Sequence, residues 1–73
     1  MSHKYIIRQK LEKGEYRYFT DNSFTGWDIR INESLVFEHQ DDAINDALVM
    51  KRTLDGIEVI AVDVIIKPVR AKN

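Results

Sequence analysis

The sequence predicts a small α+β domain in which an antiparallel sheet of three to four strands packs on one α-helix, in the order β-β-(β)-α-β. Three observations predict it. Two β-rich segments separated by a glycine open the chain, an apolar stripe with helical spacing follows, and a long β-rich segment closes it. The chain has 73 residues, 44% hydrophobic and 32% charged. This length and composition fit one folded domain spanning 1–73.

The first two β-rich segments predict a hairpin. Residues 4–10 (KYIIRQK) and 16–20 (YRYFT) have strand composition, and Gly14 between them can adopt a positive φ. Strand alternation divides the first segment into two faces: Tyr5, Ile7 and Gln9 on one, and Lys4, Ile6, Arg8 and Lys10 on the other.

The segment between hairpin and helix is less regular. Residues 21–26 (DNSFTG) have the chemistry of a turn, and Trp27 after them is typical of an aromatic lid on a core. The apolar residues of 28–37 fit neither the helical nor the strand period. This segment is therefore either a third strand or a helical turn followed by a short strand.

A helix is predicted from Gln40 to Leu54. Acidic residues begin it and basic residues end it, as the helix dipole favours, and Gly56 suits a left-handed cap. Its predicted core stripe consists of Ile44, Ala47, Leu48 and Leu54, flanked by Ala43 and Met50. The other expected core residues outside the last strand are Ile7, Tyr18, Trp27 and Phe37.

The closing segment, Ile57–Val69, predicts a strand that is apolar on both faces. The face expected to meet the helix holds Ile60, Val62, Val64 and Ile66. The opposite face holds Ile57, Val59, Ala61, Asp63 and Ile65. We expect this face to bind a partner through Ile57, Val59, Asp63 and Ile65, because one helix covers one face of a small sheet. The alternative is that residues 28–37 cover this second face. The interface would then be expected at the acidic helix start, at Glu38, Asp41 and Asp42.

Catalytic and metal-binding patterns are weak. The chain has no cysteine, and its serines and histidines form no nucleophile motif. Asp21, Ser23 and Thr25 match the first positions of a calcium loop, but Asn32 stands where the bidentate glutamate is required. We therefore expect a protein that is not an enzyme and that needs no metal and no cofactor.

The net charge of −1 conceals an uneven distribution. Residues 31–63 carry eight acidic and two basic side chains, whereas 1–30 have a local charge of +2 and 64–73 of +3. An alternative function is weak binding of single-stranded nucleic acid by a basic hairpin face. That face would combine Arg8, Lys10, Arg17 and Phe19 with Ile6. The net acidity argues against it.

The order of YIIRQ, YFT, TGW, LVFE, DDAINDA and EVIAVDVII resembles a loosely defined group of very small uncharacterised proteins. These come from the early regions of tailed phages and prophages of Gram-positive bacteria, particularly staphylococci. The resemblance covers Tyr5 to about Ile66 and rests mostly on structural signatures. It implies an accessory protein that binds a host or mobile-element protein, and it supplies no catalytic residues. With no apolar signal core and no apolar run of membrane-spanning length, we expect a non-catalytic modulator in the cytoplasm, with self-association among its modes of binding.

Overall fold

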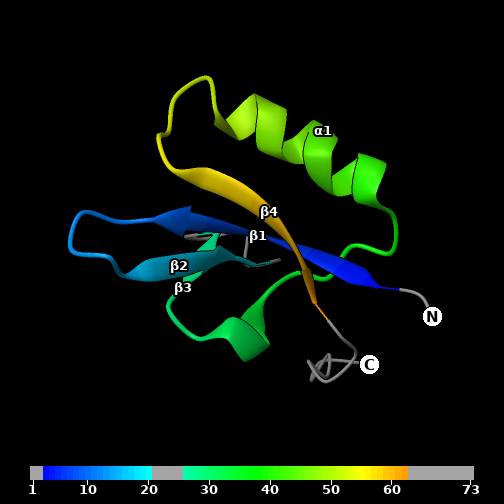
Figure 1. The fold of residues 1–73 in the computed structure, drawn as a ribbon, viewed down its shortest axis with the longest axis horizontal. Coiled ribbons are helices and arrows are strands. Elements are labelled where there is room, and N and C mark those ends of the chain that lie inside the picture. Colours follow the sequence, from blue (N-terminus) through cyan, green and yellow to red (C-terminus); the bar gives the residue numbers. More distant parts are fainter. Residues whose placement is uncertain (1–2, 21–25, 63–73) are drawn as a thin grey trace.

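A four-stranded antiparallel sheet with one helix packed on it forms the fold (Figure 1). The computed structural model describes residues 3–20 and 26–62. The elements are β1 (Lys4–Lys10), β2 (Tyr16–Phe19), β3 (Trp27–Asp28), a 3₁₀ turn η1 (Ile31–Glu33), α1 (Gln40–Met50) and β4 (Ile57–Val62). The strands lie in the order β3-β2-β1-β4, so the predicted α+β class is confirmed. Among the described residues, no helix is long and apolar enough to cross a membrane.

The predicted hairpin is confirmed. Strands β1 and β2 are antiparallel, and Gly14 in their connection has a φ of 80°. The Leu11 N–H donates to the Glu15 carbonyl at 2.7 Å and closes the turn. The register places Gln9 opposite Arg17 and thereby decides which side chains of the two strands share a face.

Beyond this paired part, the chain after η1 pairs with both strands of the hairpin. The Leu35 N–H donates to the Phe19 carbonyl at 2.8 Å, and Phe37 exchanges two backbone hydrogen bonds with Tyr5, at 2.7 and 3.0 Å. Residues 28–37 therefore follow the second of the two predicted alternatives, a helical turn and then a short extended segment. The two-residue strand β3 precedes that turn.

Helix α1 begins at Gln40 as predicted, but its orientation differs from the prediction. Ala43 and Ala47 are buried, whereas Ile44 and Leu48 are 37% and 54% exposed. Two alanines on one face allow a helix to lie close to a sheet, and the larger side chains one position further along then point to its flank. The prediction that Ile44 and Leu48 belong to the core is wrong.

One buried cluster lies between α1 and the sheet, and Ile6 is fully buried on the opposite face of the sheet. The helix ends at Met50, and the Leu54 N–H bonds to the Met50 carbonyl at 2.9 Å in the turn that follows. The buried cluster comprises Ile7, Ala43, Ala47 and Ile57. Partly buried hydrophobic side chains packed against it are Tyr5, Phe19, Trp27, Phe37, Met50, Leu54 and Val59. Tyr18, predicted in the core, is half-buried on the face opposite α1.

The two faces of β4 are the reverse of the prediction. Val59 pairs with Ile7 and Ile57 pairs with Gln9, so Ile57 and Val59 face α1, while Ile60 shares the opposite face with Ile6. Alternation separates the faces but does not say which one meets the helix, because that depends on the register with β1. Asp63, Val64, Ile65 and Ile66 lie outside the described residues.

Candidate protein interface

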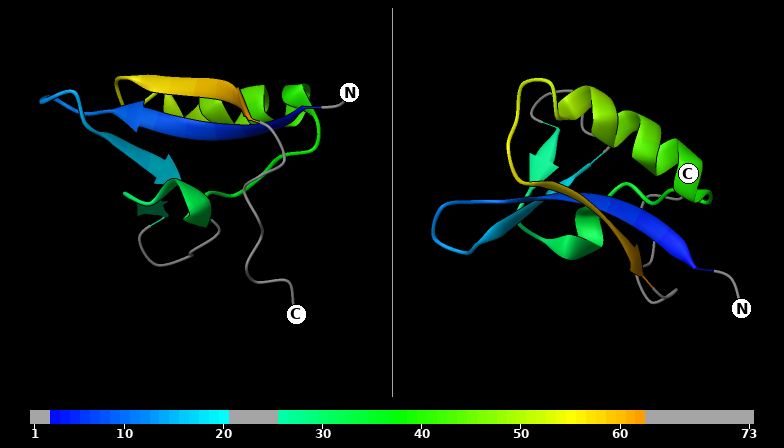
Figure 2. Two further views of the ribbon diagram at one scale, coloured as in Figure 1. Left: turned by 60° about the horizontal axis from the view of Figure 1, so that its bottom comes forward. Right: turned by 45° about the horizontal axis from the view of Figure 1, so that its top comes forward.

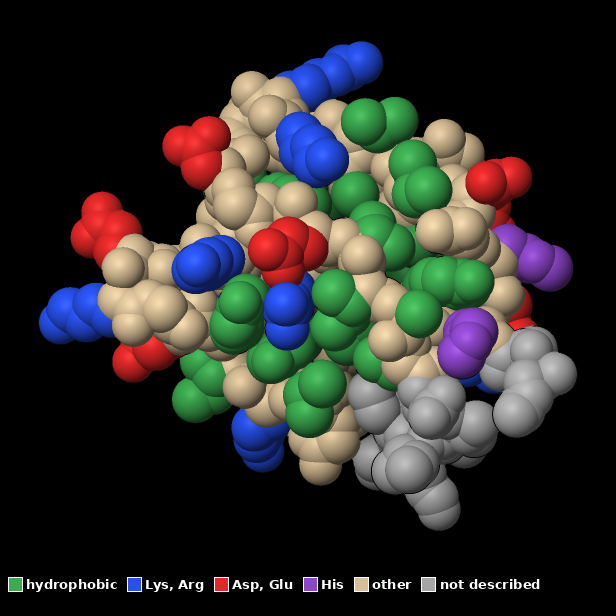
Figure 3. Space-filling view, in the orientation of Figure 1, with side chains coloured by type: hydrophobic (Ala, Val, Ile, Leu, Met, Phe, Trp, Pro, Cys, Tyr) green, Lys and Arg blue, Asp and Glu red, His purple; other side chains and the backbone are tan. Residues whose placement is uncertain are grey.

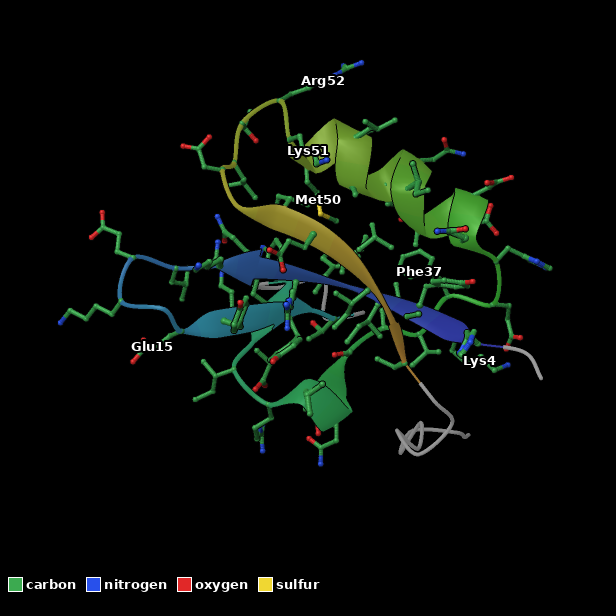
Figure 4. The ribbon with its side chains drawn as sticks, viewed as in Figure 1. Lys4, Glu15, Phe37, Met50, Lys51 and Arg52 are labelled. Atoms are coloured by element: carbon green, nitrogen blue, oxygen red, sulfur yellow. The ribbon has the colours of Figure 1, made fainter. Side chains whose placement is uncertain are left out.

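Exposed aliphatic side chains on α1 are the first feature of the site. Ile44 and Leu48 lie one turn apart, and Lys51 follows on the same flank of the helix. Val49 is 60% exposed but lies about 100° around the helix from Leu48, on the other flank. Figure 4 shows Lys51 pointing toward the viewer and Met50 directed to β4. Figure 3 shows hydrophobic side chains on this side of α1 and across β4.

The free edge of β4 is the second feature. The Lys10 N–H donates to the Gly56 carbonyl at 2.9 Å, which makes these two residues a hydrogen-bonded pair. In an antiparallel ladder such pairs alternate, so Glu58 and Ile60 bond to β1. The N–H and C=O groups of Val59 and Ala61 consequently point away from the sheet. The hydrogen bonds of Tyr5 are consistent with this alternation. Tyr5 lies opposite Ala61, and its own N–H and C=O bond to Phe37 on the other side of β1.

These two features lie side by side. Helix α1 packs on β1 and β4. In Figure 4 the Lys51 side of α1 and strand β4 both face the viewer. We call them the α1–β4 surface, defined as Ile44, Leu48 and Lys51 of α1 with the outward backbone groups of Val59 and Ala61. Within the described residues, β4 has no strand beyond it.

The acidic start of α1 adjoins this surface. Asp41 and Asp42 are exposed in the first turn of the helix, as predicted. Glu38 instead accepts a hydrogen bond from the Lys4 ammonium group of β1, and this bond lowers the pKa of the Glu38 carboxyl below its ordinary value. All three predicted acidic residues are therefore exposed, but Glu38 forms an ion pair with Lys4 of β1, whereas Asp41 and Asp42 lie in the first turn of α1.

The predicted outer row of β4 is not exposed as expected. Ile57 is 6% exposed and belongs to the core, and Val59 packs partly buried against it. The prediction that their side chains form a free apolar face is wrong, because the helix covers this face. Asp63 and Ile65, the other members of the row, lie outside the described residues.

The basic hairpin face is divided by the register. Arg8 lies opposite Tyr18, and Arg17 lies opposite Gln9, so these two guanidinium groups occur on opposite faces. Arg8 bonds to Glu58 at 2.7 Å, and its guanidinium carbon lies 3.9 Å from the centroid of the Tyr16 ring. The prediction that Arg8, Lys10, Arg17 and Phe19 share one face is wrong.

Arg17 takes part in a network on the helix side of the sheet. Its guanidinium carbon lies 4.6 Å from the centroid of the Trp27 ring, which in turn makes an edge contact with Phe19. The Arg17 Nε donates to the Gln9 side chain at 2.7 Å, and Gln9 donates to the Asp55 carbonyl at 2.9 Å. Gln9 is buried, so this network holds β1, β2 and the turn before β4 together.

Two further observations concern other kinds of site. In the described ranges 3–20 and 26–62, no group of three or more His, Asp or Glu could hold a metal ion. The start of the partial calcium loop, residues 21–25, lies outside those ranges. The chain matches no family model, no curated protein and no solved structure.

Reasoning from sequence missed Ile44 and Leu48 as surface residues. The signal that could have found them is the spacing of Ala43 and Ala47, which places two small side chains one turn apart. A helix that packs close to a sheet uses such positions, and the neighbouring large aliphatic residues are then left at the flank.

Proposed function

We propose that this chain is a non-catalytic protein-binding protein and that the α1–β4 surface is its binding site. One observation carries the proposal: α1 buries its alanines and leaves Ile44 and Leu48 in water. Large aliphatic side chains next to a free strand edge are typical of a surface that another protein covers. Covering the exposed half of Leu48 would contribute about 1 kcal/mol to binding.

The biological setting of the proposal comes from the resemblance to small early-region phage proteins. It favours a modulator that acts in the cytoplasm of an infected bacterium on a host or mobile-element protein. The exposed acids at the start of α1, Asp41 and Asp42, would favour a partner with basic groups beside an apolar contact.

A capture experiment with two matched variants tests the proposal. The immobilised chain is incubated with staphylococcal lysate, and retained proteins are identified by mass spectrometry and then measured with purified components. Leu48→Glu should abolish retention, whereas Val49→Glu, the same change on the other flank of α1, should preserve it. Retention that survives both variants would contradict the proposed site.

A salt series separates protein binding from the nucleic-acid alternative. Contacts to phosphates give a steep fall in affinity as salt increases, because bound counterions are released. An apolar interface at the α1–β4 surface should show a shallow dependence. A steep slope with a single-stranded oligonucleotide would favour the alternative.

A further inference from the structure

We infer that the occupant of the α1–β4 surface is a second copy of this chain, joined by antiparallel pairing of the two β4 strands about a twofold axis. The inference rests on the proposed function, whose binding site it completes. Three observations support it: the free edge of β4, the position of α1 above the sheet, and the charges at the two ends of α1.

Within its described residues, 57–62, β4 contains no proline and no lysine, two residues that commonly protect an edge strand. Natural edges are commonly blocked by proline, lysine, a bulge or a covering segment. The strand reads IEVIAV, and Glu58, its charged residue, is held by Arg8 of the neighbouring strand. Val59 and Ala61 direct their N–H and C=O groups outward. Two such edges in antiparallel orientation are complementary, because each offers donors and acceptors at alternate residues.

The position of α1 fits this pairing. Adjacent antiparallel strands are related by a twofold axis perpendicular to the sheet, so both helices would lie on the same face of a continuous sheet. Helix α1 packs on both β1 and β4, with Ala43 and Ala47 in one buried cluster with Ile7 of β1 and Ile57 of β4, so its axis lies over these two strands (Figure 2). Strands are about 4.8 Å apart, so the two helices would lie two strand spacings apart, roughly 10 Å.

Roughly 10 Å is the upper end of the distance at which helices pack side by side. Strand pairing and helix packing are therefore compatible with each other. Ile44 and Leu48 of each copy would face the same flank of the other copy. The exposed aliphatic flank of α1 and the open edge of β4 thus have one common explanation.

The charges on α1 favour the same arrangement. A twofold axis makes the two helices antiparallel, so the acidic first turn of one, with Asp41 and Asp42, lies toward the Lys51 and Arg52 end of the other. Opposite charges would approach one another at both ends of the helix pair. A parallel arrangement would bring like charges together.

The experiment measures the mass of the full chain by sedimentation equilibrium over a concentration series that reaches about 200 µM, where weak micromolar dimers are populated. The wild-type chain should reach twice the mass of the monomer. Leu48→Glu should raise the dimer dissociation constant by about 100-fold or more, because it brings two carboxylates toward the twofold axis. Val49→Glu should change it by less than about threefold, because Val49 lies on the other flank. Circular dichroism verifies that each variant is folded.

A backbone variant tests the strand pairing separately. Ala61→Pro removes an outward N–H that β1 does not use, a change that an edge strand tolerates. It should abolish the dimer while the circular dichroism spectrum stays that of the folded chain. A variant that dimerises as the wild type does would overturn β4 pairing. If Ala61→Pro unfolds the chain, the Leu48→Glu and Val49→Glu pair still decides the inference.

The other outcomes distinguish this inference from the proposed function. A wild-type chain that stays monomeric at about 200 µM, but still loses lysate capture with Leu48→Glu, would overturn self-association and leave the proposed binding site standing. Equal effects of Leu48→Glu and Val49→Glu on the mass would overturn the inference as well. If Leu48→Glu loses neither dimerisation nor lysate capture, both the inference and the proposed binding site are contradicted.

Discussion

The orientation of α1 predicts opposite responses of two neighbouring residues. Ala47 is 2% exposed and lies between the helix and the sheet, whereas Leu48 is 54% exposed. Leu48→Ala should therefore destabilise the monomer only slightly, and Ala47→Leu should destabilise it strongly. The reverse would hold if the apolar stripe were centred on the larger residues.

The magnitudes follow from burial. Replacing a fully buried leucine by alanine costs about 2–5 kcal/mol, which includes a cavity term. Leu48 keeps half of its surface in water and would leave no closed cavity. About 1 kcal/mol of transfer free energy is lost, and the better helix propensity of alanine offsets part of it. Ala47→Leu adds three carbon atoms to a closed contact and should cost about 1–3 kcal/mol or more.

Urea unfolding followed by circular dichroism measures both changes. The protein concentration is kept well below the dimer dissociation constant, so that the melts report the monomer. The expected order of unfolding midpoints is wild type, then Leu48→Ala slightly lower, then Ala47→Leu clearly lowest. A loss above about 2.5 kcal/mol for Leu48→Ala, together with a tolerated Ala47→Leu, would refute the observed orientation of α1.

Three further predictions concern the sheet and its connections. Gly56→Ala should cost about 2–4 kcal/mol in urea melts and Gly14→Ala about 1, since both have positive φ but only at Gly56 would a Cβ meet a backbone oxygen, at 2.7 Å. Hydrogen bonds from Arg30 lower the pKa of Asp28 from 3.8 to about 2, so their stabilisation is present above about pH 4 and is lost as the pH falls toward 2. Carboxyl NMR titration should show this pKa return toward its ordinary value in Arg30→Gln. Gln9→Leu should cost about 1–3 kcal/mol in the same melts, because Gln9 is buried and its loss leaves the half-buried Arg17 side chain without its acceptor and the Asp55 carbonyl without its donor. Equal losses for the two glycines, an ordinary Asp28 pKa in the wild type, or a neutral Gln9→Leu would each contradict the corresponding contact.

Features set by neighbouring residues could be predicted from the sequence. The hairpin follows from alternation on either side of a turn with Gly14 at a positive φ, and the start of α1 at Gln40 follows from the acidic residues and the apolar period after it. The α+β class follows from the order of these elements.

Features set by contacts between distant segments could not be predicted. Ala43, Ile44, Ala47 and Leu48 are all apolar, so the helical period is compatible with a stripe centred on either pair. The register of β4 on β1 decides that Ile57 and Val59 face the helix, and this register depends on a contact between Gly56 and Lys10. The side chains of Ile57 and Val59, predicted to form a free apolar face, lie against the helix for this reason.

Residue-resolved amide hydrogen exchange tests the central claim, that the α1–β4 surface binds protein through the open edge of β4. The amide groups of Val59 and Ala61 point outward and should exchange fast in the dilute chain. They should become protected as the protein concentration rises, while Ile60, which bonds to β1, stays protected throughout. Fast exchange of Val59 and Ala61 at every concentration and with every captured partner would contradict the claim.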